Sequence, residues 1–105
     1  MKEISTLQLK AMLETPSPPA VLDVREDWEW QRAHLDAAQH VPMGQVPGRL
    51  SEIDRERDVV VMCHHGGRSR QIVLFLEQQG FDRALNLRGG IDAWSREVDP
   101  SVPTY

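Results

Sequence analysis

The chain has 105 residues, of which 40% are hydrophobic and 27% charged, which predicts one globular domain spanning residues 1–105. Its formal net charge is −4, so we expect neither nucleic acid nor an anionic membrane as a partner, since both attract an excess of Lys and Arg. The N-terminal residues lack the apolar core of a signal peptide, and no apolar run approaches the roughly 20 residues that cross a bilayer. We therefore expect a cytoplasmic protein. Its single cysteine, which excludes an internal disulfide, fits a reducing compartment.

The first part of the chain alternates strand and helix patterns. A short strand around Ile4 precedes Ser5, where a serine followed three residues later by a glutamine is the capping box of a helix. A proline-rich segment ends that helix, and the β-branched run 20–24 predicts a core strand with both faces buried. Asp27 is placed to cap a helix through residue 33. Its two tryptophans cannot share one helix face, so we expect one in the core and one near the rim.

The middle of the chain has a weaker pattern. Residues 40–42 predict an edge strand, because the proline at its end cannot donate a ladder hydrogen bond. Residues 45–53 predict a short, irregular helix with three apolar side chains facing inward. The run 59–62 is wholly apolar and predicts a buried strand.

The last part completes an alternating pattern. Residues 69–79 predict a helix closed by Gly80, residues 84–87 predict a strand, and residues 91–94 predict the final helix. Strands that alternate with helices are typical of an α/β fold, with a parallel sheet covered on both faces. Ligands bind such sheets at the carboxyl ends of the strands.

One strand-to-helix turn concentrates the reactive side chains. Cys63 follows the buried strand, and the potentially cationic His64, His65, Arg68 and Arg70 lie within the next seven residues of an otherwise acidic chain. Unpaired N–H groups at the start of a helix, together with the helix dipole, favour an anion over such a turn. The same field favours the deprotonated form of a thiol. We therefore expect a reactive thiolate at Cys63 and a small anionic ligand beside it.

Four segments resemble the single-domain rhodanese-like sulfurtransferases. They are residues 21–30, 33–42, 63–68 and 87–94, in the order and spacing of the family, and the ending 99–105 also resembles bacterial members. The chain departs from the family pattern at Ala33 and Ala37, where glycine is usual, so the local turn is expected to pack differently. The resemblance implies a small doubly wound domain with a central parallel sheet of about five strands, and sulfur transfer through a cysteine persulfide.

The expected reaction is a two-step covalent cycle of a thiosulfate sulfurtransferase. The Cys63 thiolate attacks the outer sulfur of thiosulfate or a related donor and expels sulfite, and a thiol or cyanide then takes the sulfur from the persulfide. No metal or organic cofactor is needed. The loop N–H groups are expected to stabilise the anionic sulfur, and Arg68 to offer its guanidinium to the bound anion. The expected substrate-binding loop is His64, His65, Gly66, Gly67, Arg68 and Ser69.

Protein tyrosine phosphatases and related arsenate reductases offer an alternative chemistry. They resemble this chain in their turn but place five residues between cysteine and arginine, which forms a cradle for a tetrahedral oxyanion. Here only four residues separate Cys63 from Arg68, and Arg70 comes one residue too late. The shorter loop favours a single sulfur atom. A third function is a sulfur carrier or interaction module, fed by a protein desulfurase and delivering sulfur to a protein acceptor.

Other polar residues are assigned supporting roles. Asp23 and Arg25 follow the strand 20–24 and are expected to form a structural ion pair or to brace the Cys63 loop. His34 and His40 are expected to be structural. Adjacent histidines rarely converge on one ion, and no second ligand pair is spaced for zinc, so we do not expect a metal at the loop.

Overall fold

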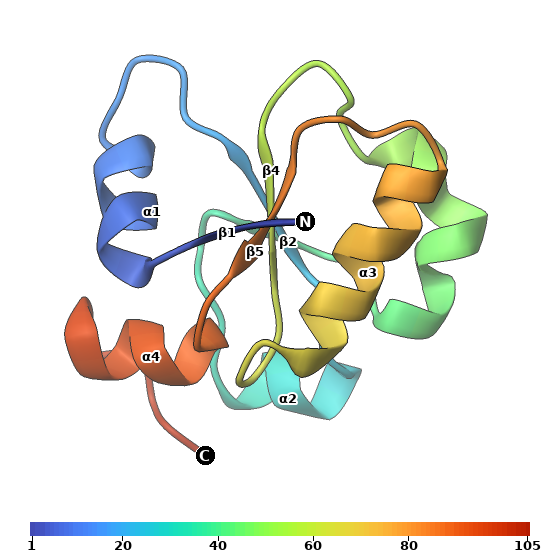
Figure 1. Cartoon of the computed structure of the whole chain (residues 1–105). Coiled ribbons are helices and arrows are strands. Elements are labelled where there is room, and N and C mark those ends of the chain that lie inside the picture. The colour runs from blue at the N-terminus through green and yellow to red at the C-terminus, as the bar shows by residue number, and fades with distance from the viewer.

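The computed structural model describes all 105 residues and contains one five-stranded sheet (Figure 1). The strand order is β1-β5-β4-β2-β3, and every neighbouring pair is parallel. The strands are β1 (Lys2–Ile4), β2 (Ala20–Asp23), β3 (Ala38–His40), β4 (Val59–Met62) and β5 (Ala84–Leu87). The expected α/β class and parallel sheet are therefore confirmed, with β4 at the centre.

Helices cover both faces of this sheet. They are α1 (Thr6–Leu13), α2 (Asp27–Arg32), the 3₁₀ segment η1 (Met43–Glu52), α3 (Gly67–Gln78) and α4 (Gly90–Glu97). Figure 1 shows α1 and α4 on one side of the strands and α3 and η1 on the other, while α2 lies below the turn from β4 to α3. The fold is therefore doubly wound, as expected. No helix is long and apolar enough to cross a membrane.

The position of β4 at the centre of the sheet explains why its sequence is apolar at every position. Val60 and Met62 pack into the apolar layer beneath α1 and α4, whereas Val59 and Val61 pack into the layer beneath α3 and η1. All four side chains are buried, so neither face of the strand tolerates a polar residue. Cys63 follows this strand directly, so it is anchored by a strand whose four side chains are all buried.

Several local predictions are confirmed by backbone geometry. Ser5 caps α1, because its hydroxyl oxygen accepts a hydrogen bond from the Gln8 backbone N–H at 3.1 Å, while the Ser5 backbone N–H donates to the Gln8 side-chain Oε1 at 2.8 Å. Gly80 ends the α3 segment with φ +88°, a left-handed conformation that suits glycine at this position. Phe81 is buried beside it, and its amide bonds the Leu76 carbonyl at 3.0 Å.

Other boundaries differ from the expectation. Helix α3 begins at Gly67, not at residue 69, because Gly66 turns the chain with φ +119°. Helix α2 is capped by Glu26, not by Asp27, since the Glu26 amide is bonded by the Glu29 carboxylate at 3.0 Å.

The segment between β3 and β4 also differs from the predicted pattern. The edge strand β3 ends at His40, so Val41 and Pro42 lie beyond it. The segment η1 is a 3₁₀ helix with Pro47 inside it and a kink at Arg49, which matches the expected irregularity.

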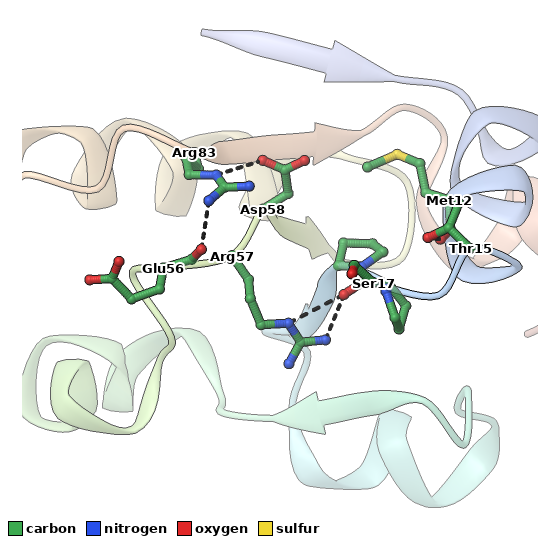
Figure 2. A pocket seen from close by; sticks show the side chains of 9 residues that line it. Met12, Thr15, Ser17, Glu56, Arg57, Asp58 and Arg83 are labelled. Atoms are coloured by element: carbon green, nitrogen blue, oxygen red, sulfur yellow. Dashed lines mark hydrogen bonds and ion pairs between the residues drawn. The ribbon is translucent and has the colours of Figure 1, made fainter.

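A cavity of about 610 Å³ lies at the amino ends of the strands, opposite Cys63 (Figure 2). Its two arginines bind groups of neighbouring segments. Arg57 donates to the Pro18 carbonyl at 2.8 Å, and Arg83 bonds the Asp58 carboxylate at 3.1 Å and the Glu56 carbonyl. These contacts connect the segments that precede β2, β4 and β5, so we assign the cavity a structural role.

Candidate active site

Cys63 lies at the carboxyl end of the central strand, where the strand order reverses. Strand β2 pairs with β4, and the Val24 amide continues the ladder to the Met62 carbonyl at 3.1 Å. The ends of β2 and β4 are therefore neighbours, as the alternating pattern predicts. Reversals of strand order in parallel sheets leave a crevice at the carboxyl end, which is the usual binding position.

The Cys63 sulfur is held inside a tight loop. The residue is 1% exposed, and its Sγ accepts a hydrogen bond from the Gly66 amide at 3.0 Å. Ser69 places its Oγ 3.4 Å from the same sulfur. A backbone N–H aimed at sulfur stabilises negative charge there, which supports the expectation of a reactive thiolate.

Helix α4 binds the other side of this loop. The amides of Ile91 and Asp92, in its first turn, donate to the carbonyls of Cys63 and His64 at 2.9 and 3.1 Å. These bonds satisfy helix N–H groups that would otherwise have no partner, and they turn both loop carbonyls toward α4. Gly90 makes the contact possible, because a Cβ at this position would overlap both carbonyl groups.

The Arg68 guanidinium, which we expect to be offered to the bound anion, already has a partner within the protein. It forms a bidentate ion pair with Glu29, with Nη1–Oε1 and Nη2–Oε2 distances of 2.5 and 2.8 Å. The Glu29 side chain is 3% exposed and that of Arg68 is 34% exposed. The first turn of α3 is thereby fixed to α2, a contact that the sequence did not predict.

Tyr105 links this pair to the end of β2. Its hydroxyl donates to Glu29 Oε2 at 2.6 Å and accepts from Arg25 Nη1 at 2.9 Å. Arg25 in turn forms a fully buried ion pair with Asp23, with Nη2 and Oδ2 2.7 Å apart. The predicted ion pair is confirmed, but neither residue contacts the Cys63 loop directly. Their support reaches it through Tyr105 and Glu29.

The two loop histidines differ in environment. His64 stacks on the Tyr105 ring with centroids 4.0 Å apart and planes 7° apart, and its Nε2 is buried with no hydrogen-bond partner. Burial, reinforced by the neighbouring charge of His65, lowers the pKa of His64 below its ordinary value. His65 is exposed on the rim, 3.9 Å from Asp92. His64 is therefore neutral at pH 7, in a packing position.

His34 and His40 lie away from the loop, on either side of Trp30. Their rings stack on the indole with centroid distances of 4.2 and 4.7 Å, and one nitrogen of each imidazole is hydrogen-bonded to a backbone carbonyl. This packing supports the structural role expected for both histidines. Trp28, by contrast, is 56% exposed. Trp30 is half-buried and lies in neither apolar layer, so the expectation of one tryptophan in the core is not met.

A hollow of about 400 Å³ adjoins the glycines of the loop. It is lined by Glu3, His65, Gly66, Gly67, Arg70, Asn86, Arg88 and Gly89. The Glu29 side of the loop is filled by the Arg68–Glu29 ion pair and by the Tyr105 ring, whereas the α3–β5 side borders this hollow, with the Arg70–Glu3 ion pair in its wall.

The family of the protein follows from this geometry and from sequence comparison. The profile of the rhodanese-like domain matches residues 5–97. The chain belongs to the rhodanese-like family. One relative is a sulfurtransferase of Allochromatium vinosum, which is 40% identical over 102 residues. The match covers 97% of this chain and 95% of the relative.

Two further relatives cover the whole domain. Thiosulfate sulfurtransferase GlpE of Actinobacillus pleuropneumoniae is 35% identical over 103 residues, covering 98% of this chain and 94% of the relative. The crystal structure of a rhodanese-like domain protein from Staphylococcus aureus superposes with a TM-score of 0.87 at 32% identity, covering 100% of this chain and 99% of the other. The expected rhodanese-like fold is confirmed, and the named relatives support a transferase of sulfur.

Replacing Gly90 by Ala tests the contact between α4 and the loop. We expect a loss of about 2–4 kcal/mol in the free energy of unfolding, because the added Cβ overlaps the Cys63 and His64 carbonyls and φ is +58°. Urea unfolding measures it. Gly48→Ala is the matched control, since nothing lies within 4 Å of its added Cβ. Equal stabilities of the two variants would contradict the proposed contact.

Replacing Glu29 by Gln tests the buried ion pair through its pH dependence. The hydrogen bond from Arg68 lowers the pKa of Glu29 from 4.5 to about 2, against the effect of burial. Because the folded state has the lower pKa, this stabilisation is complete above about pH 4.5 and is lost as the pH falls toward 2.

The difference in unfolding free energy between wild type and Glu29→Gln should therefore shrink on acidification. We expect a change on the order of 2 kcal/mol, reduced from the full linkage value because solvent screens the partly exposed Arg68. Urea unfolding at a series of pH values measures it. A constant difference between the two proteins would show that the pair is not linked to folding.

Proposed function

We propose that this rhodanese-like protein moves a sulfane sulfur from thiosulfate or a related donor to a thiol or cyanide, through a persulfide on Cys63. The observation that carries the proposal is the bond from the Gly66 amide to the Cys63 sulfur at 3.0 Å, at the start of α3. A sulfur held this way is both nucleophilic and able to remain anionic. The sulfurtransferase names of the full-length relatives support the same chemistry.

The first step transfers one sulfur atom and releases sulfite. The Cys63 thiolate attacks the outer sulfur of thiosulfate, forming a sulfur–sulfur bond to Cys63 as the bond to the sulfonate sulfur breaks. The electron pair of the broken bond leaves with sulfite. The negative charge of the product lies on the outer sulfur, and the N–H groups at the start of α3 favour an anion there.

The second step needs an acceptor from outside the protein. Cys63 is the only cysteine of the chain, so no second thiol of the same chain can resolve the persulfide. An external thiolate or cyanide attacks the outer sulfur, and Cys63 leaves as the thiolate. The acceptor is a small thiol or a cysteine of a protein partner, and the hollow beside Gly66 and Gly67 is the approach open to it.

The position of Arg68 favours sulfur transfer over phosphoryl transfer. A phosphatase-type loop needs its arginine to bind two oxygens of a tetrahedral anion. Here both terminal nitrogens of Arg68 are bound to Glu29, and Tyr105 holds that carboxylate in place. A single sulfur atom needs only the loop N–H groups, and these do not depend on the guanidinium.

Intact mass spectrometry after incubation with thiosulfate tests the persulfide directly. We expect wild type to gain the mass of one sulfur atom, because Cys63 accepts the outer sulfur, and to lose it when cyanide is added, with thiocyanate as the product. Cys63→Ala should gain nothing. The matched control is Ser95→Ala, which removes a buried hydroxyl that bonds the Ile91 carbonyl. This variant should gain one sulfur atom as wild type does.

The alternatives predict different results. Loading by a protein desulfurase but not by thiosulfate would favour a sulfur carrier. Absence of a sulfur adduct with every donor, in a protein that is folded by circular dichroism, would refute the proposed function. Release of phosphate from an aryl phosphate that is abolished in Cys63→Ser would favour the phosphatase alternative.

A further inference from the structure

A chain of hydrogen bonds connects a carboxylate on β1 with the Cys63 sulfur. The Asn86 Nδ2 group, on β5, donates to Glu3 Oε2 at 2.9 Å. The Ser69 hydroxyl bonds the Asn86 Oδ1 atom at 2.6 Å and lies 3.4 Å from Cys63 Sγ. Asn86 is 1% exposed and Ser69 is fully buried, so water does not compete for these positions.

The orientation of the Asn86 amide follows from its neighbours. The Nδ2 atom faces two groups that can only accept, the Glu3 carboxylate at 2.9 Å and the Gly66 carbonyl at 3.4 Å. Turning the amide over would place Oδ1 against both of these oxygens and leave no donor for them. Arg70 Nη2 bonds Glu3 at 3.1 Å, and the Asn86 and Arg70 bonds lower the pKa of Glu3, so the carboxylate remains ionised.

The fixed amide decides where the only proton of the Ser69 hydroxyl lies. Because Asn86 Oδ1 has no proton, the 2.6 Å contact requires Ser69 to donate. The second acceptor near this hydroxyl, the Gly66 carbonyl at 3.2 Å, also draws the proton away from sulfur. The Ser69 oxygen therefore presents a lone pair to Cys63.

We propose that Asn86, held by Glu3, fixes Ser69 as the hydrogen-bond acceptor of the neutral Cys63 thiol. Asn86 is then a positioning residue for the reacting sulfur, and this role rests on the proposed sulfur transfer. The resting S–H group donates to Ser69, and the Gly66 amide donates to the same sulfur atom. Ser69 has no proton to offer a sulfur anion, so the loop N–H groups stabilise the charge of the thiolate and of the persulfide.

Infrared spectroscopy of the S–H stretch tests this arrangement. Cys63 is the only cysteine, so the band belongs to a single group. In wild type at mildly acidic pH we expect a band at lower frequency than that of a free thiol, because the S–H group is a donor. In Ser69→Ala the band should move to higher frequency, because the acceptor is gone.

Two further variants test the role of Asn86. In Asn86→Leu the Ser69 hydroxyl loses its 2.6 Å acceptor and keeps only the longer bond to the Gly66 carbonyl at 3.2 Å, so its proton turns toward sulfur for part of the time. The S–H band should then shift to higher frequency, by less than in Ser69→Ala, although Ser69 is retained. In Glu3→Ala, which leaves the buried Asn86 amide in place, the S–H band should shift to higher frequency by less than it does in Ser69→Ala. This second variant decides the question if Asn86→Leu fails to fold. The matched control is Ser95→Ala, whose hydroxyl bonds the Ile91 carbonyl at 3.0 Å, and its band should equal that of wild type.

The outcomes separate this proposal from the proposed function. A wild-type frequency in Ser69→Ala would overturn the proposal, as would a wild-type frequency in both Asn86→Leu and Glu3→Ala. Absence of any S–H band at mildly acidic pH would also overturn it, because the sulfur would then be held as a thiolate. The spectra require no sulfur transfer, so they stand even if thiosulfate leaves no adduct on Cys63, a result that counts against the function alone.

Discussion

The Glu29 carboxylate is the interaction on which the arrangement of the site depends. It binds the Arg68 guanidinium with both oxygens, the Tyr105 hydroxyl and the Glu26 amide, and is 3% exposed. Removing this group would leave three partly buried donors, on Arg68, Tyr105 and the Glu26 amide, without this acceptor, which costs more than the loss of a fully exposed ion pair. This carboxylate fixes the first turn of α3 against α2 and the C-terminus, while the apolar side chains Ile72, Val73 and Leu76 pack α3 on the sheet.

The two ends of the sheet carry charges that serve different purposes. At the amino end, Arg57 and Arg83 bind carbonyls and a carboxylate of neighbouring segments around the large cavity there. At the carboxyl end the Arg68–Glu29 pair lies on one side of the loop, and the hollow on the Gly66–Gly67 side is bordered by a second pair, Arg70–Glu3. The larger cavity therefore lies at the end of the sheet opposite the candidate site.

The sequence predicts what depends on neighbours along the chain. The apolar run of β4, the strand β5, the capping box of Ser5 and the glycine after α3 are local patterns, and the structure contains each of them. The Cys63 turn is predicted for the same reason. The sequence predicts the start of α3 two residues too late. The true boundary depends on the positive φ of Gly66, and a glycine in a sequence can have either sign of φ.

What the sequence did not predict depends on contacts across long separations. Glu29 and Arg68 are 39 residues apart, and Tyr105 lies 76 residues from Glu29, so no spacing rule connects them. An arginine next to a reactive cysteine suggests an anion as its partner, and only the packing of α2 against the loop shows that a carboxylate of the protein already occupies that position. Because this carboxylate binds both terminal nitrogens of the guanidinium, the Gly66 backbone N–H is the donor that contacts the Cys63 sulfur. In the proposed function that N–H stabilises negative charge on sulfur, which needs no guanidinium beside the reacting atom.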